Sequence, residues 1–161
     1  MKSLLAIIAC VVLVAVGTVV AKNESHMKSD NKPMMTDHTG MKAKAVFAGG
    51  CFWCMEKPFE SLEGVSEVIS GYAGGESVDP NYNNYMSGGH IEVVEIHYDP
   101  EIITFSELLD VYWRQVDPTD AGGQFVDRGH GYTTAIFVSN EEERRIAEQS
   151  RNALAAKNIF T

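Results

Sequence analysis

Apolar residues recur along the chain with two different spacings, and these predict alternating strands and helices. Runs with adjacent or alternating apolar residues predict buried strands at residues 45–48, 65–72, 91–98 and 132–138. Apolar residues three and four positions apart predict helices at residues 52–62, 104–116 and 141–157. Two split βαβ units followed by a helix predict an α+β fold, a ferredoxin-like two-layer α/β plait with helices on one face of an antiparallel sheet.

Residues at the predicted helix ends add detail to these boundaries. Thr104 with Glu107 three residues later forms a capping-box signature, and Ser139 with Glu142 repeats it before the last helix. Pro58 lies beyond the first turn of the first helix, where it is expected to kink or split that helix.

The first 43 residues do not follow this pattern. Residues 1–21 place Lys2 before an unbroken apolar stretch, which is the layout of a secretory signal peptide or an uncleaved membrane anchor. A lipid anchor at Cys10 and a buried core helix are the less favoured alternatives. Residues 22–43 are polar and unpatterned and predict a flexible linker, whose methionines and histidines are also compatible with copper binding. We therefore expect an exported protein, periplasmic or anchored facing the periplasm, with one catalytic domain at residues 44–161.

Composition and charge exclude one class of partner. At 161 residues and 45% hydrophobic content, the chain fits one globular domain with some appended sequence. The formal net charge of −9 becomes one unit more negative when the single lysine of residues 1–21 is left out. A chain this acidic has no basic face with which to neutralise phosphates, so nucleic acid is not expected as a partner. We expect a monomer.

Two cysteines mark the junction between the first strand and the first helix, in the run Gly50-Cys51-Phe52-Trp53-Cys54. A thiol at a helix N-terminus is favoured as the thiolate, so Cys51 is the candidate nucleophile. Cys54 lies one turn later on the same face, within reach of a sulfur bonded to Cys51. A bridge this short stabilises a fold little through chain entropy, which favours redox or metal chemistry over a structural disulfide. A metal or structural pair, and an inert Cys54, remain possible on these residues alone.

Other residues add polar and aromatic groups. Glu92 shares a strand face with Val94 and Ile96, where burial would raise its pKa and let it donate a proton near neutral pH. An ordinary edge-strand glutamate fits the pattern equally well, and Glu95 on the opposite face is predicted to be solvated. Phe52 and Trp53 would wall an apolar pocket or join the core.

Two glycine-rich loops carry further polar side chains. Their tyrosines can donate hydrogen bonds to an oxygen, although packing is the commoner use; they are Tyr82, Tyr85 and Tyr132. Asp127 precedes Tyr132 and is compatible with a simple turn residue. His90 and His130 flank the same region and are interpreted as surface residues.

Five motifs occur in order across residues 44–160: Gly50-Cys51-Phe52-Trp53, Gly71-Tyr72-Ala73-Gly74-Gly75, Gly89-His90-Ile91-Glu92, Tyr98-Asp99-Pro100 and Asp117-Pro118. Together they resemble the peptide methionine sulfoxide reductase A family. The resemblance implies the reduction of methionine (S)-sulfoxide, free or in oxidised proteins and peptides, without a cofactor or metal.

The same resemblance assigns roles to the site residues. Cys51 would attack the sulfoxide sulfur while Glu92 protonates the departing oxygen. Hydrogen bonds to that oxygen would come from Tyr82 and Tyr132. Phe52 and Trp53 would hold the S-methyl group, and Asp127 would help to fix the substrate. The sulfenic acid left on Cys51 would condense with Cys54 to a disulfide, which thioredoxin or a similar dithiol reductant would reduce.

The sequence departs from the family pattern in two places. Cys54 stands where many members have glycine, and matches the subgroup with a recycling cysteine inside the motif. The chain also stops at Thr161, where the family continues into a C-terminal tail over the site, so we expect reduced activity from this C-terminally truncated domain.

Two other functions remain as alternatives. A thioredoxin-like disulfide oxidoreductase would explain the Cys-x-x-Cys pair but not Glu92. An exported metal-binding protein would use Cys51 and Cys54 with His90 or His130, although the paired ligand spacing of a structural zinc site is absent from the sequence.

Overall fold

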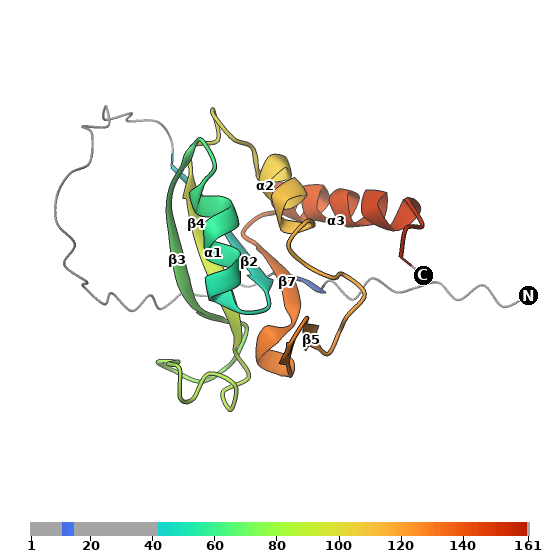
Figure 1. The fold of residues 1–161 in the computed structure, drawn as a ribbon. Coiled ribbons are helices and arrows are strands. Elements are labelled where there is room, and N and C mark those ends of the chain that lie inside the picture. Colours follow the sequence, from blue (N-terminus) through green and yellow to red (C-terminus); the bar gives the residue numbers. More distant parts are fainter. Residues whose placement is uncertain (1–10, 15–41, 161) are drawn as a thin grey trace, which may run out of the picture.

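The computed structural model describes residues 11–14 and 42–160, which form a sheet with three helices packed against one face (Figure 1). The strands of the main sheet are β1 (Val11–Val14), β2 (Ala43–Gly49), β3 (Val65–Ala73), β4 (Ile91–Tyr98) and β7 (Thr134–Val138). The helices are α1 (Phe52–Glu60), α2 (Phe105–Tyr112) and α3 (Glu141–Ala156). A small two-stranded sheet, β5 (Gly123–Gln124) with β6 (Asp127–Arg128), precedes the 3₁₀ turn η1 (His130–Tyr132).

The strand order in the main sheet is β1-β7-β2-β4-β3. β2 pairs antiparallel with β4 and β7, and β3 pairs antiparallel with β4, while β1 runs parallel to β7. β4 is therefore an interior strand, and its register puts Glu92 opposite Tyr72 of β3. Apart from β1, Lys42 and the first residue of β2, the predicted signal peptide or anchor (1–21) and linker (22–43) lie outside the described residues. Among the residues that are described, no helix has the length and apolar character needed to span a membrane.

The core lies between the sheet and the helices. Residues of all three helices join one apolar cluster with alternate residues of β2, β4 and β7. At its centre the Phe47 ring lies 5.8 Å from the rings of Phe59 and Phe105 and 5.2 Å from that of Tyr112. The Tyr112 hydroxyl donates to the Ala48 carbonyl at 2.9 Å, which anchors the end of β2 just before the cysteine motif.

The helix ends confirm one capping prediction and correct another. Thr104 and Glu107 form a reciprocal capping box at the start of α2. The cap of α3 is Asn140, whose side chain accepts from the Glu143 amide at 2.8 Å, so the predicted Ser139–Glu142 pair is wrong by one residue. Ser139 instead donates to the Glu143 carboxylate. Both residue types cap well, and the choice follows from where β7 ends.

Three further boundaries differ from the sequence prediction. Pro58 does not split α1, because it lies near the end of the helix and only two helical residues follow it. α2 ends at Tyr112, and turns rather than helix lead to residue 116. The last strand begins at Thr134 and not at the predicted Tyr132, because the 3₁₀ turn η1 extends through Tyr132.

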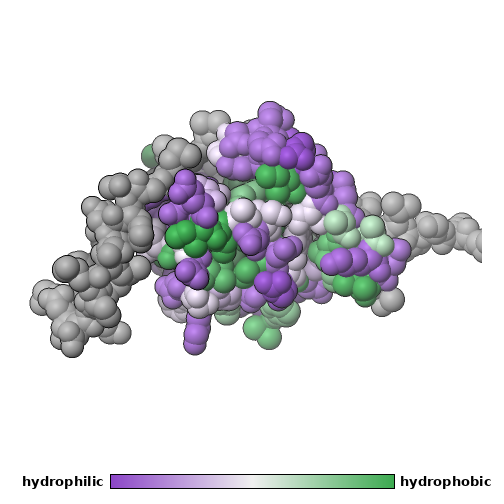
Figure 2. Space-filling view, turned by 90° about the horizontal axis from the view of Figure 1, so that it is seen from above, coloured by the Kyte–Doolittle hydropathy of each residue, from purple (hydrophilic) through white to green (hydrophobic). Residues whose placement is uncertain are grey.

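The surface of the described part is largely hydrophilic when seen from above, with apolar side chains gathered in separate patches (Figure 2). Ile102, on the loop before α2, is half exposed. Isolated apolar residues of this kind are common on globular surfaces.

Candidate active site

Cys51 lies at the point where β2 turns into α1. Gly50 has φ of +91°, and a Cβ at this position would lie 2.7 Å from the Gln124 Cβ, so only glycine fits this turn. Cys51 is the N-cap of α1, and its carbonyl accepts from the amides of Cys54 and Met55 at 3.0 and 3.3 Å. The half-buried Cys51 thiol thus lies at a helix N-terminus, where the helix dipole favours an anion.

Cys54 lies one turn along the same helix, and its side chain is exposed. The pKa of its thiol is raised, first by partial burial and then by the neighbouring Cys51, to which it is hydrogen-bonded. Asp127 and Glu92 add smaller electrostatic contributions in the same direction. The two sulfurs are therefore neighbours, with Cys54 on the solvent side.

Glu92 is buried on β4 with only 2% of its surface exposed. It lies on the same strand face as Val94 and Ile96, beneath α1, and not at a sheet edge. The Phe52 amide donates to its Oε2 at 2.9 Å, and the Tyr85 hydroxyl donates to its Oε1 at 3.0 Å. Burial raises the pKa of this carboxyl and Asp127 adds to the rise, while the two hydrogen bonds partly offset it.

Four tyrosines gather around Glu92. Tyr85 is 3% exposed and stacks on Tyr72 with ring centroids 4.6 Å apart. Burial, hydrogen bonding to Tyr132 and Glu92, and their charges raise the pKa of Tyr85. Tyr82 is 65% exposed, and its ring lies 6.4 Å from that of Tyr85. The direct partner of the acid is thus Tyr85, which the sequence offered only as one of several possible donors.

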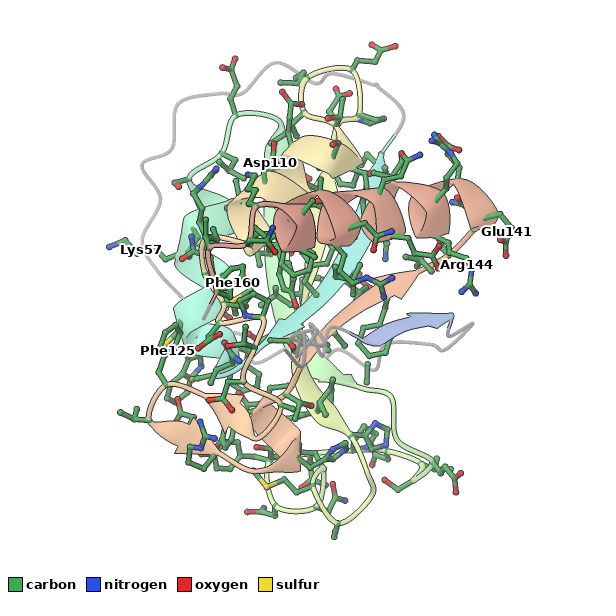
Figure 3. The ribbon with its side chains drawn as sticks, turned by 90° about the vertical axis from the view of Figure 1, so that its right-hand side faces the viewer. Lys57, Asp110, Phe125, Glu141, Arg144 and Phe160 are labelled. Atoms are coloured by element: carbon green, nitrogen blue, oxygen red, sulfur yellow. The ribbon has the colours of Figure 1, made fainter. Side chains whose placement is uncertain are left out.

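A cavity of about 290 Å³ opens beside the two thiols. Its lining includes Cys51, Cys54, Phe125 and Asp127, so the predicted nucleophile and the predicted substrate-fixing carboxylate share one space. Phe125 comes from the loop between β5 and β6, and Figure 3 shows it at the end of α1 that carries the cysteines.

The two aromatics between the cysteines have different surroundings. Phe52 is buried, with its ring 5.8 Å from Tyr72 and 5.9 Å from Trp53. Trp53 is 70% exposed. The Phe52 ring therefore packs among the residues around Glu92, whereas the Trp53 ring is exposed at the surface next to the thiols.

Gln124 is a site residue that the sequence did not indicate. It is buried against Gly50, its Oε1 accepts from the Asp117 amide at 2.7 Å, and its Nε2 donates to the Asp117 carbonyl at 3.0 Å. These bonds hold the start of the loop that carries Phe125 and Asp127 against residues 117–120, and the Gln124 side chain packs against Gly50 just before Cys51. No local pattern signals such a role, because every partner of the side chain is a backbone group.

Two interpretations from sequence need correction. His90 is buried and not a surface residue: its Nδ1 accepts from the Gly75 amide at 3.2 Å, and its Nε2 lies 3.0 Å from the Ser77 carbonyl. His130 is exposed as expected. Glu95 is not free in solvent, because Lys44 bonds to it at 2.8 Å and His97 at 2.6 Å. Burial opposes ionisation of Glu95, but these partners lower its pKa.

Metal ligation finds no support in this arrangement. Within residues 11–14 and 42–160, no group of three histidine, cysteine or carboxylate side chains is placed to hold a metal ion. Both ring nitrogens of His90 are already engaged by backbone groups. A pair of thiols at a helix start, next to a buried carboxyl whose pKa is raised, is instead typical of a thiol-dependent oxidoreductase.

Comparison with known proteins defines the family. The family model described as peptide methionine sulfoxide reductase matches residues 43–161, and the chain belongs to this family. The peptide methionine sulfoxide reductase MsrA of Listeria innocua is 56% identical over 119 residues, which are 73% of this chain and 67% of that protein. The MsrA of Ligilactobacillus salivarius is 54% identical over 121 residues, covering 74% of this chain and 70% of the relative.

Solved structures agree with this assignment. The methionine sulfoxide reductase A of Corynebacterium diphtheriae superposes with a TM-score of 0.65 at 30% identity, covering 78% of this chain and 63% of that one. The reduced form of Mxr1 from Saccharomyces cerevisiae gives a TM-score of 0.68 at 26% identity, covering 72% and 70%. The chain thus spans about two thirds of the length of the proteins it matches. Its mixed α/β fold, with an antiparallel sheet and three helices, is theirs.

Proposed function

We propose that this chain is a peptide-methionine (S)-S-oxide reductase that acts on methionine sulfoxide in oxidised proteins and peptides and as the free amino acid. The observation that carries the proposal is the buried carboxyl of Glu92. This carboxyl accepts a hydrogen bond from the amide of Phe52, the residue that follows Cys51. A thiolate displaces oxygen from sulfur only when that oxygen is protonated as it leaves. A carboxyl with a raised pKa is better suited to this need, and burial raises the pKa of Glu92.

The proposed reaction divides the work among the site residues. The Cys51 thiolate forms a bond to the sulfoxide sulfur, Glu92 supplies a proton to the oxygen, and methionine departs as Cys51 becomes a sulfenic acid. Tyr82 and Tyr132 are proposed to hydrogen-bond the oxygen. Phe52 and Trp53 are proposed to contact the S-methyl group, and Asp127 to fix the rest of the substrate. Asp127 is supported by its place in the cavity wall beside both thiols.

Cys54 is the proposed recycling thiol. Its sulfur attacks the sulfenic sulfur of Cys51, which releases water and leaves a disulfide between the two residues. Thioredoxin or a similar dithiol then reduces this disulfide. Attack is proposed at the Cys54 sulfur, because Cys54 is exposed whereas Cys51 is half-buried.

Two further features of the chain belong to this proposal. We infer that β7-β2-β4-β3 forms the predicted ferredoxin-like plait, since α1 links β2 to β3 across β4, and α2 lies between β4 and β7 in the chain. The apolar stretch in residues 1–21 supports export, and we propose a monomer that works outside the cytoplasm.

A direct test compares the two sulfoxide epimers. Purified chain is incubated with a peptide containing methionine (S)-sulfoxide or methionine (R)-sulfoxide, with dithiothreitol as reductant, and the product methionine is quantified. We expect turnover of the S epimer only and none with Cys51→Ser. Glu92→Gln separates the thioredoxin-like alternative, because it should abolish sulfoxide reduction while leaving disulfide exchange almost unchanged. Equal loss of both activities in Glu92→Gln, or reduction of both epimers, would reject the proposal.

A further inference from the structure

Tyr85 is a buried hydroxyl that touches the proposed acid and has no role in the reaction described so far. Its hydroxyl donates to Glu92 Oε1 at 3.0 Å, and Tyr132 is near enough to contribute to the raised pKa of Tyr85. Its ring is held in place by stacking on Tyr72. Tyr85 therefore connects the buried acid to Tyr132, which is half-buried in η1.

The turn that carries Tyr132 is shaped to admit this ring. Gly131 precedes Tyr132, and a Cβ at position 131 would lie 2.8 Å from Cε2 of Tyr85. A contact that short forces a neighbour to move, so the absence of a side chain at position 131 permits the approach of Tyr85 to η1. This observation is independent of the hydrogen bond to Glu92.

The carboxyl geometry indicates where the proton of Glu92 is carried. The Phe52 amide can only donate, so Oε2 serves as the acceptor. The proton of the neutral acid then lies on Oε1, facing the Tyr85 hydroxyl. A hydroxyl both accepts and donates, so Tyr85 accepts from neutral Glu92 while donating to Tyr132, and donates to Glu92 once the carboxylate forms.

We propose that Tyr85 is a positioning and relay residue that passes the proton of Glu92 to Tyr132 during sulfoxide reduction. This proposal rests on the function proposed above. In the step, Oε1 releases its proton to the Tyr85 oxygen, Tyr85 releases its own to the Tyr132 oxygen, and Tyr132 releases its own to the sulfoxide oxygen. Glu92 ends as the carboxylate, both tyrosines end neutral, and the oxygen leaving sulfur has gained one proton.

The test is the first turnover of the reduced chain with a methionine (S)-sulfoxide peptide, measured from pH 5 to pH 9. Tyr85→Phe should slow this turnover at least about tenfold. It should also move the basic limb of the profile to higher pH by about one unit, because the hydroxyl stabilises the Glu92 carboxylate. The groups that face Glu92 from its surroundings are Asp127 on β6, Cys54 on α1, Tyr72 on β3 and Tyr85.

Two further variants separate a relay from simple packing. Tyr132→Phe combined with Tyr85→Phe should be no slower than the slower single variant, since both remove links of one chain. Tyr98→Phe removes another buried hydroxyl, at the far end of β4, and should leave rate and profile unchanged. Thermal melting of each variant shows that it is folded.

The outcomes of these experiments distinguish failure of the relay from failure of the proposed reductase function. If the wild-type chain does not reduce the sulfoxide, the proposed function itself fails. If the wild-type chain is active but Tyr85→Phe keeps its rate within twofold, the relay is wrong and the function stands. A slower Tyr85→Phe with an unmoved basic limb, or a double variant in which the two losses multiply, would also overturn the relay.

Discussion

Replacing Gln124 by methionine tests whether this side chain holds the cavity loop in place. Methionine has nearly the same length and shape, so the substitution removes the amide group without opening a large cavity. The amide bonds only backbone groups: Oε1 accepts from the Asp117 amide at 2.7 Å, and Nε2 has the carbonyls of Gly123, Asp117 and Asp120 at 2.7, 3.0 and 3.3 Å. Nε2 carries two hydrogens, so about three of these four contacts count as full hydrogen bonds.

The expected loss follows from this count. A buried hydrogen bond contributes about 1 kcal/mol net, and a partner left unsatisfied costs about 1–3 kcal/mol. Gln124→Met should therefore lower the free energy of unfolding by about 3 kcal/mol, which for a domain of this size lowers Tm by roughly 10 °C. The same loop carries Phe125 and Asp127, which line the cavity beside the thiols. Gln124→Met should therefore also raise KM for a sulfoxide peptide.

Urea unfolding followed by circular dichroism measures the effect. The midpoint should fall with an unchanged slope, which marks a change in stability rather than in the extent of unfolding. The matched control is Gln149→Met on the exposed face of α3, where the change should stay within about 0.5 kcal/mol. A loss below about 1 kcal/mol for Gln124→Met would show that the amide bonds to residues 117–123 do not hold this loop in place.

Three further predictions test other parts of the structure. The pKa of Glu92 in the folded state lies above its ordinary value of 4.5. The contribution of Glu92 to the stability of the fold is therefore complete below pH 4.5 and is lost as the pH rises through the folded-state pKa. Relative to the wild type, Glu92→Gln should gain stability between pH 5 and pH 8, measured by denaturant titration. Gly50→Ala places a side chain at φ +91° and 2.7 Å from Gln124, and should lower the free energy of unfolding by at least about 2 kcal/mol in thermal melts. Asn140→Ala should cost about 1 kcal/mol in urea unfolding and Ser139→Ala clearly less, whereas the reverse order would restore the capping pair predicted from sequence.

The strands β2, β3, β4 and β7 and the three helices were predictable because each carries its own periodicity, whereas the short β5, β6 and η1 lie in a segment expected to be a loop. Alternation along β4 put Glu92 on the buried face, and the structure confirms that face. The capping box at Thr104 was equally local, since both partners lie within one turn. At the start of α3, two good capping residues are adjacent, and the choice of Asn140 depends on how β7 ends, which local propensity does not specify.

The residues whose roles the sequence did not specify act through the folding of loops and not through helix or strand periodicity. Tyr85 meets Glu92 only because the loop before β4 folds back on β3, where Tyr72 stacks against it. Gln124 acts through backbone partners, which leave no residue pattern to read. The buried His90 is similar, because its partners are the amide and carbonyl of a glycine-rich loop. Such roles depend on tertiary contacts that a single sequence does not display.

The central claim is that Cys51 takes the sulfoxide oxygen and Cys54 resolves the product. It is tested most directly by a reaction without reductant: fully reduced chain is mixed with excess methionine (S)-sulfoxide peptide, and methionine is counted per chain. The account predicts one methionine per chain, together with a Cys51–Cys54 disulfide identified by peptide mapping and loss of both free thiols. No methionine above background, or the same amount from Cys51→Ser, would contradict it.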